Sequence, residues 1–97
     1  MAFIQVIECR TSKVDEILTL EREWERATEG KRTLQRSIVG RDRNDPNRYV
    51  ILAFFDSYES AMENSKLPET QAFAEKQGAL VDGAMTFTDL DVIDEHS

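Results

Sequence analysis

The chain has 97 residues, of which 40% are hydrophobic and 32% are charged, and its formal net charge is −7. This length and composition are typical of one globular domain with its own core. The negative charge argues against a nucleic-acid backbone or an anionic membrane as partner, because both bind basic surfaces. No segment stays apolar over the roughly 20 residues that a membrane-spanning helix needs.

Cysteine and histidine each occur once, as Cys9 and His96. A single cysteine forms no internal disulfide, and His96 stands one residue from the end of the chain. A histidine-based metal site or catalytic pair is therefore not expected. The N-terminus enters a strand pattern without the basic and long apolar regions of a signal peptide. Together these features predict a cytoplasmic location.

The first predicted elements are a strand and an amphipathic helix. Residues 2–9 are rich in β-branched and aromatic side chains and predict a strand. In the helix that follows, Ser12 and Asp15 have the spacing of a capping box, and Gly30 is placed to end it. Its charged residues, Glu21 among them, are assigned to the solvent-exposed face. Apolar residues at intervals of three or four form its stripe: Val14, Ile17, Leu18, Leu20, Trp24 and Ala27.

A β-hairpin is predicted from two strand-like runs, residues 33–43 and 48–55. They are joined by a turn at residues 44–47, where Asn, Asp and Pro favour that conformation. The run 48–55 is apolar on both of its alternating faces. One face holds Tyr49, Ile51, Ala53 and Phe55, and the other holds Val50, Leu52 and Phe54. A strand of this kind needs cover on both sides.

The rest of the chain predicts a second helical region and a last strand. Asp56 and Glu59 have capping spacing at the start of the helical region, and Pro68 restarts it after an interruption. Residues 84–93 predict the last strand, and residues 94–97 predict a disordered tail. The stripe of the helical region comprises Tyr58, Ala61, Met62, Phe73, Gln77, Leu80 and Val81.

The element order is β-α-β-β-α-β over a single domain, residues 1–97. This order is typical of the ferredoxin-like α+β fold, a four-stranded antiparallel sheet with both helices on one face. The other face would be uncovered, although the runs 2–9 and 48–55 are apolar there as well. Uncovered apolar faces usually mark interfaces, and a two-fold dimer lets one patch meet its own copy. We therefore expect a homodimer whose sheets pack face to face or close into a dimeric α/β barrel.

Nearly the whole chain resembles the antibiotic-biosynthesis-monooxygenase-like domains of the dimeric α+β barrel superfamily. Members of that family often have an aromatic residue, a helix start with Ser and Glu, a His, and a Pro before a Phe-containing helix. The best local match is Phe54-Phe55-Asp56-Ser57-Tyr58-Glu59-Ser60-Ala61, followed by Asn64, Leu67-Pro68 and Gln71-Ala72-Phe73.

The resemblance implies a cleft between the helices and the sheet. Some members use it for cofactor-independent oxygenation of polyphenolic substrates, and others degrade haem. The haem-degrading members use an Asn, a Trp and a His, and Gln5, Phe55 and Asn64 stand at the matching positions here. Without the His there is no axial iron ligand, so haem degradation by that route is not expected. No metal, flavin or nicotinamide motif is present either, and we expect no cofactor.

Oxygenation without a cofactor needs an apolar pocket and a few polar groups that bind and deprotonate an activated phenol. The candidate catalytic residues are Gln5, Tyr58 and Asn64, and the candidate ligand-binding residues are Trp24, Arg36, Tyr49 and Phe55. Each candidate also has a structural interpretation, such as core packing for Trp24 and an ion pair for Arg36.

Three function classes share this fold. The first is a small-molecule monooxygenase acting on an aromatic or polyketide-type substrate. The second is a non-catalytic ligand-binding or dimerisation module. The third, an RNA-binding domain, does not fit, because the chain is acidic and lacks exposed strand aromatics among basic residues. An open, polar-lined cleft would favour an enzyme or a ligand carrier, whereas a cleft filled by Trp24, Met62 and Phe73 would favour the module.

Overall fold

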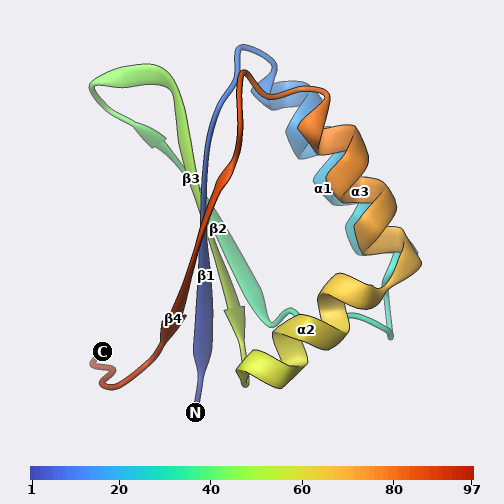
Figure 1. The fold of residues 1–97 in the computed structure, drawn as a ribbon, viewed down its shortest axis with the longest axis vertical. Coiled ribbons are helices and arrows are strands. Elements are labelled where there is room, and N and C mark those ends of the chain that lie inside the picture. The colour runs from blue at the N-terminus through green and yellow to red at the C-terminus, as the bar shows by residue number, and fades with distance from the viewer.

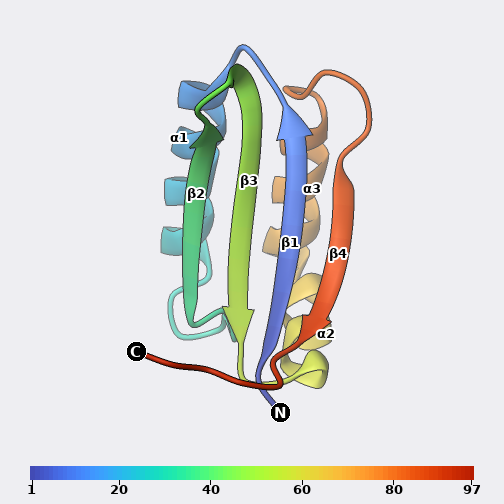
Figure 2. The ribbon, with the colours of Figure 1, turned by 90° about the vertical axis from the view of Figure 1, so that its left-hand side faces the viewer.

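The computed structural model describes all 97 residues as one sheet and one helical layer. The strands form an antiparallel sheet in the order β2-β3-β1-β4. All three helices lie on one side of it (Figure 1), and the other side is uncovered (Figure 2). The elements are β1 (Phe3–Arg10), α1 (Val14–Ala27), β2 (Arg36–Asp42), β3 (Asp45–Phe55), α2 (Tyr58–Lys66), α3 (Pro68–Gly78) and β4 (Thr86–Asp91). The predicted ferredoxin-like fold is confirmed, with the second helical region divided in two at Pro68.

The central strand β3 has one face toward the helices and one toward solvent. Its helix-facing residues are all buried: Tyr49, Ile51, Ala53 and Phe55. They lie beside Cys9, Ile7, Gln5 and Phe3 of β1 in the antiparallel register. The alternate residues Val50, Leu52 and Phe54 are only half-buried, because no helix covers them. The two apolar faces predicted for this strand are therefore present.

The capping residues differ from the predicted ones at both helix starts. At α1, the residue before the helix is Lys13 and no side chain caps the first turn. Thr11 Oγ1 accepts instead from the N–H of Lys13 at 2.9 Å, in the turn before the helix. At α2, the Oγ of Ser57 accepts from the N–H of Ser60 at 3.0 Å, one residue after the predicted Asp56. The predicted capping boxes were wrong because each helix begins one residue later than the predicted cap requires.

The β2–β3 hairpin turns at residues 43–44, earlier than the predicted turn at 44–47. Asp42 Oδ1 accepts from the N–H of Asn44 at 2.8 Å, which closes this tighter turn. Pro46 consequently falls inside β3, on the part of the strand that extends beyond its pairing with β1.

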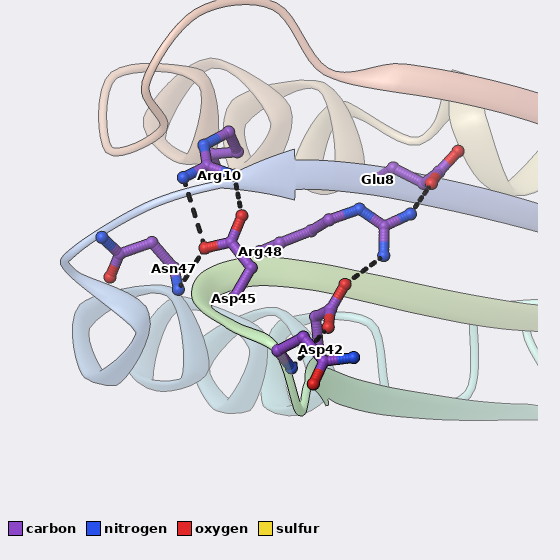
Figure 3. A network of polar contacts seen from close by, with 7 residues as sticks. Glu8, Arg10, Asp42, Asp45, Asn47 and Arg48 are labelled. Atoms are coloured by element: carbon purple, nitrogen blue, oxygen red, sulfur yellow. Dashed lines mark hydrogen bonds and ion pairs between the residues drawn. The ribbon is translucent and has the colours of Figure 1, made fainter.

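Ion pairs join three strands at this end of the sheet (Figure 3). The Arg48 guanidinium contacts Glu8 of β1 and Asp42 of β2, the latter at 3.1 Å. Arg10 pairs with Asp45, and its hydrogen bond lowers the pKa of the Asp45 carboxyl. The network therefore fixes the register of β2, β3 and β1 at the hairpin end.

The last strand is the exposed edge strand β4, and residues 92–97 form no helix or strand. None of the three helices has the length and apolar character that would let it cross a membrane.

Candidate functional site

Two adjoining chambers form a cleft between the helical layer and the sheet. Its inner chamber, of about 120 Å³, lies among α1, α2, α3 and the strands β1, β2 and β3. Its outer chamber, of about 590 Å³, is bounded by α3, β1, and the connection from α3 into β4. The chambers share five lining residues: Gln5, Ile7, Thr70, Phe73 and Gln77. The helical layer and the sheet therefore do not close into a solid core.

Small residues keep this space open. Ser37 and Ala53 line the sheet side of the inner chamber, and Ala74 and Gly78 line the α3 side of the outer one. A Cβ added at Gly78 would meet no heavy atom within 4 Å. Gly78 therefore marks a point where the chain could carry a side chain and instead leaves room.

Aromatic side chains form the apolar walls of the inner chamber. They are Trp24 of α1, Phe55 of β3 and Phe73 of α3. The rings of Trp24 and Phe73 have centroids 6.2 Å apart and are tilted by 43°. The indole Nε1 donates to Thr70 Oγ1 at 2.9 Å, which ties α1 to α3 and fixes the ring. These walls are typical of a site that takes an apolar or aromatic ligand.

Three side-chain amides from three elements line the same chamber. Gln5 Nε2 donates to Asp89 Oδ1 at 3.2 Å, and Asn64 Oδ1 accepts from the N–H of Thr33 at 3.1 Å. Gln77 is only 4% exposed, and none of the side-chain hydrogen bonds within the chain involves it. No fully enclosed side-chain polar atom lacks a partner, so the Gln77 amide must be reachable from the cleft. It is free to bind a ligand.

Glu21 is the only charged residue that lines either chamber. The sequence had assigned it to the solvent-exposed face of α1, and that assignment was wrong. Burial raises the pKa of its carboxyl, the nearby charge of Glu25 raises it further, and Arg22 lowers it. Its position could have been found from helical spacing, because it stands four residues after the buried Ile17 and three before the buried Trp24.

The structure brings four of the seven sequence candidates together, and the other three lie elsewhere. Gln5, Trp24, Phe55 and Asn64 line the inner chamber. Tyr58 is 49% exposed and packs edge-on against Phe3, with ring centroids 5.5 Å apart. Tyr49 is buried, and its hydroxyl accepts from Arg41 Nε at 3.0 Å. Arg36 is on the uncovered face, with its guanidinium 5.1 Å from the Phe54 ring centroid.

Other reactive or titratable groups have structural surroundings. Cys9 is buried, and burial raises the pKa of its thiol, which disfavours the reactive thiolate. Glu69 pairs with Lys31 at 2.7 Å, and this contact lowers the pKa of the Glu69 carboxyl. No group of three or more His, Cys, Asp or Glu side chains is placed to hold a metal ion.

Comparison with known proteins finds no matching family model and no curated relative. Solved structures do match. A variant of SnoaB, a cofactor-independent oxygenase from Streptomyces nogalater, superposes with a TM-score of 0.81 at 14% identity, over 97% of this chain and 95% of that one. A protein from Chloroflexus aurantiacus, assigned to the antibiotic biosynthesis monooxygenases, superposes with a TM-score of 0.75 at 18% identity, over 100% and 98%. The chain therefore has the fold of antibiotic biosynthesis monooxygenase domains.

Proposed function

We propose that the cleft binds a small aromatic or polyketide-type molecule and catalyses its oxygenation by O2 without a cofactor. The observation that carries the proposal is the cleft, whose two adjoining chambers have aromatic walls and a free Gln77 amide within a domain of only 97 residues. The outer chamber alone falls within the roughly 300–1,000 Å³ of small-molecule sites. The structural similarity to SnoaB also supports the proposal, because SnoaB is a cofactor-independent oxygenase with the same fold.

The division of the cleft suits a planar substrate. Trp24, Phe55 and Phe73 offer ring faces and edges to the reacting end of an aromatic system. Amides from Gln5, Asn64 and Gln77 provide hydrogen-bond donors and acceptors that fix its orientation. The outer chamber holds the rest of the molecule and gives it a path in and out.

The proposal is tested by incubating the protein with anthrone in air and following anthraquinone by its absorbance. We expect a rate above the protein-free blank. Gly78→Leu should abolish this rate, because the new side chain enters the outer chamber. Gly78→Ala is the matched control and should retain most of the rate. Both substitutions favour the helix over glycine, so a lost rate in Gly78→Leu would report blocking rather than unfolding.

A ligand-binding measurement separates the competing module from the enzyme. Trp24 is the only tryptophan, and it lines the inner chamber, so its fluorescence reports anthraquinone binding. Quenching with no oxidation above the blank would overturn catalysis of this class and favour a non-catalytic ligand-binding module. If anthraquinone does not quench Trp24 and anthrone is not oxidised, the assignment of the cleft as an aromatic site is overturned.

The proposal includes a homodimer formed through the uncovered sheet face and a cytoplasmic location. The half-buried apolar residues of β1 and β3 on that face support the dimer. The dimer would leave the cleft free, because the cleft lies on the opposite face of the sheet.

A further inference from the structure

The position of Glu21 has no structural explanation within the chain. It is partly buried on the inner side of α1, where it lines the inner chamber. None of the ion pairs of the structure includes it. No side-chain hydrogen bond occupies its carboxylate either, and no enclosed polar atom is unpaired, so its oxygens are reachable from the cleft. A carboxylate in this position is available to a ligand.

The surroundings of Glu21 favour proton uptake by its carboxylate. The groups that face it from β1, β2, β3, α2 and α3 are apolar or uncharged, and none of them titrates. The nearest charges are on its own helix, where Glu25 raises its pKa and Arg22 lowers it, in addition to the larger effect of burial. A carboxylate in such surroundings holds a proton more readily than one in water.

We infer that Glu21 is the proton acceptor for an uncharged, hydroxylated aromatic substrate whose ring lies among Trp24, Phe55 and Phe73. This inference rests on the proposed function. Gln5 and Gln77 are the positioning residues, because their amides line both chambers and can hold the substrate oxygens.

The reaction balances with O2 as the oxidant. The O–H bond of the enol form of anthrone breaks, and its proton moves to Glu21. The resulting anion is electron-rich enough to reduce O2, and a carbon–oxygen bond forms at the ring carbon opposite the oxygen. Glu21 returns its proton to the outer oxygen of the peroxide anion. The remaining C–H bond of that ring carbon then breaks, its electron pair forms the second carbonyl as the O–O bond breaks, and the departing hydroxide takes up the released proton to give water. Overall, anthrone and O2 give anthraquinone and water.

The same carboxylate sets charge selectivity. No cationic residue lines either chamber, so a carboxylated substrate would bring a second negative charge beside Glu21 with nothing to balance it. We therefore expect uncharged phenols to bind and carboxylated analogues to be rejected. Replacing Glu21 with glutamine should relax this rejection while it removes the base.

The test compares the wild type with Glu21→Gln, and with Glu29→Gln as a matched control. Glu29 is exposed and lines neither chamber. The measurements are anthrone oxidation across pH, anthraquinone binding by Trp24 fluorescence, and binding of a carboxylated anthraquinone. For Glu21→Gln we expect turnover to fall about 100-fold or more, the range of lost general-base catalysis. We also expect the acid limb of the pH profile to disappear, anthraquinone binding to persist, and the carboxylated analogue to bind more tightly.

A third variant, Glu25→Gln, keeps the proton acceptor but removes a charge that raises its pKa. The acid limb of its pH profile for anthrone oxidation should move to lower pH. A purely structural role for Glu21 would not produce this shift. If the wild type oxidises anthrone and Glu21→Gln has the same rate and pH profile, the inference is overturned and the proposed function stands. No turnover by the wild type would overturn both. Loss of anthraquinone binding in Glu21→Gln would show that the carboxylate holds the site together, which overturns its role as a base.

Discussion

At the scale of single residues, Glu21 is a charge that the fold keeps in an unfavourable place. The inner stripe of α1 runs through Ile17, Glu21, Trp24 and Thr28, and the other three members are all buried. An apolar residue at position 21 would continue this stripe without any desolvation of charge. Perturbed carboxyls in a cleft are concentrated at functional sites, which is why we assign Glu21 a chemical role.

Replacing Glu21 should therefore stabilise the protein at neutral pH. Because the pKa of Glu21 is raised in the folded state, its stabilising contribution is complete below the ordinary glutamate pKa. That contribution is lost as the pH rises through the raised folded value. Glu21→Gln should then melt a few degrees above the wild type at pH 7, and the two should converge in acid. The check is thermal unfolding by circular dichroism from pH 3 to 8. Glu29→Gln should follow the wild type throughout, and a lower melting temperature for Glu21→Gln at pH 7 would contradict the argument.

Part of this cleft could be predicted from the sequence. Gln5, Phe55 and Asn64 were found because a family resemblance pointed to their positions, and they do line the inner chamber. Glu21 was missed because a charged residue was assumed to be exposed, although its helical spacing placed it between buried positions. Arg36 was expected to bind a ligand or to form an ion pair, but its register with Phe54 puts it on the uncovered side, away from the cleft. Which face a strand residue occupies depends on pairing with distant strands, and a local pattern does not contain that information.

At the scale of elements, one hydroxyl joins two connections that are far apart in the sequence. Thr11 directly follows β1 and is 1% exposed. Its Oγ1 donates to the Leu80 carbonyl at 2.6 Å and accepts from the Lys13 N–H at 2.9 Å. Nearby, the N–H of Asp82 donates to the Arg10 carbonyl at 2.7 Å. These bonds hold the start of the segment between α3 and β4, whose later residues line the outer chamber.

Thr11→Val should therefore destabilise the protein. Valine has nearly the same shape but leaves the Leu80 carbonyl and the Lys13 N–H without their partner. Leaving buried groups unpaired costs about 1–3 kcal/mol. Thr11→Ser is the matched control, because it keeps the hydroxyl and loses one methyl group. Urea unfolding should give a clearly lower midpoint for Thr11→Val than for Thr11→Ser. Equal midpoints would show that the hydroxyl contributes nothing to stability.

The same bond explains which parts of the fold were predictable. The element order could be predicted because hydrophobic periodicity and Pro68 are local signals. The hydroxyl that closes the turn before α1 could not be predicted, since Ser12 and Thr11 are equally suitable by type. Thr11 is selected by burial and by the Leu80 carbonyl, 69 residues along the chain. Contacts of that kind exist only once the sheet and helices have assembled.

At the scale of the whole molecule, the uncovered sheet face carries apolar residues from all four strands, with Arg36 of β2 beside Phe54 as a cation on the same face. Leu52 of β3 lies between Val6 of β1 and Ile38 of β2, and one row along the strands Phe54 is paired with Ile4. Leu90 of β4 and Ile38 are 44% and 39% exposed. The charged network of Arg48, Glu8 and Asp42 limits this apolar area at the hairpin end. A second copy of the same face would cover it by two-fold symmetry and keep the charges at the rim.

Leu52→Glu should convert the expected dimer into a monomer. A carboxylate at the centre of the apolar face would meet its own copy near the two-fold axis, where it would be removed from water. Analytical ultracentrifugation at micromolar concentration should give a dimer for the wild type and a monomer for Leu52→Glu. Ser12→Glu adds the same charge at an exposed position on the helical side and should remain dimeric. A monomeric wild type would refute the interface. Because the cleft opens on the other face, anthraquinone should still quench the Trp24 fluorescence of Leu52→Glu. This result would show that ligand binding does not depend on the dimer.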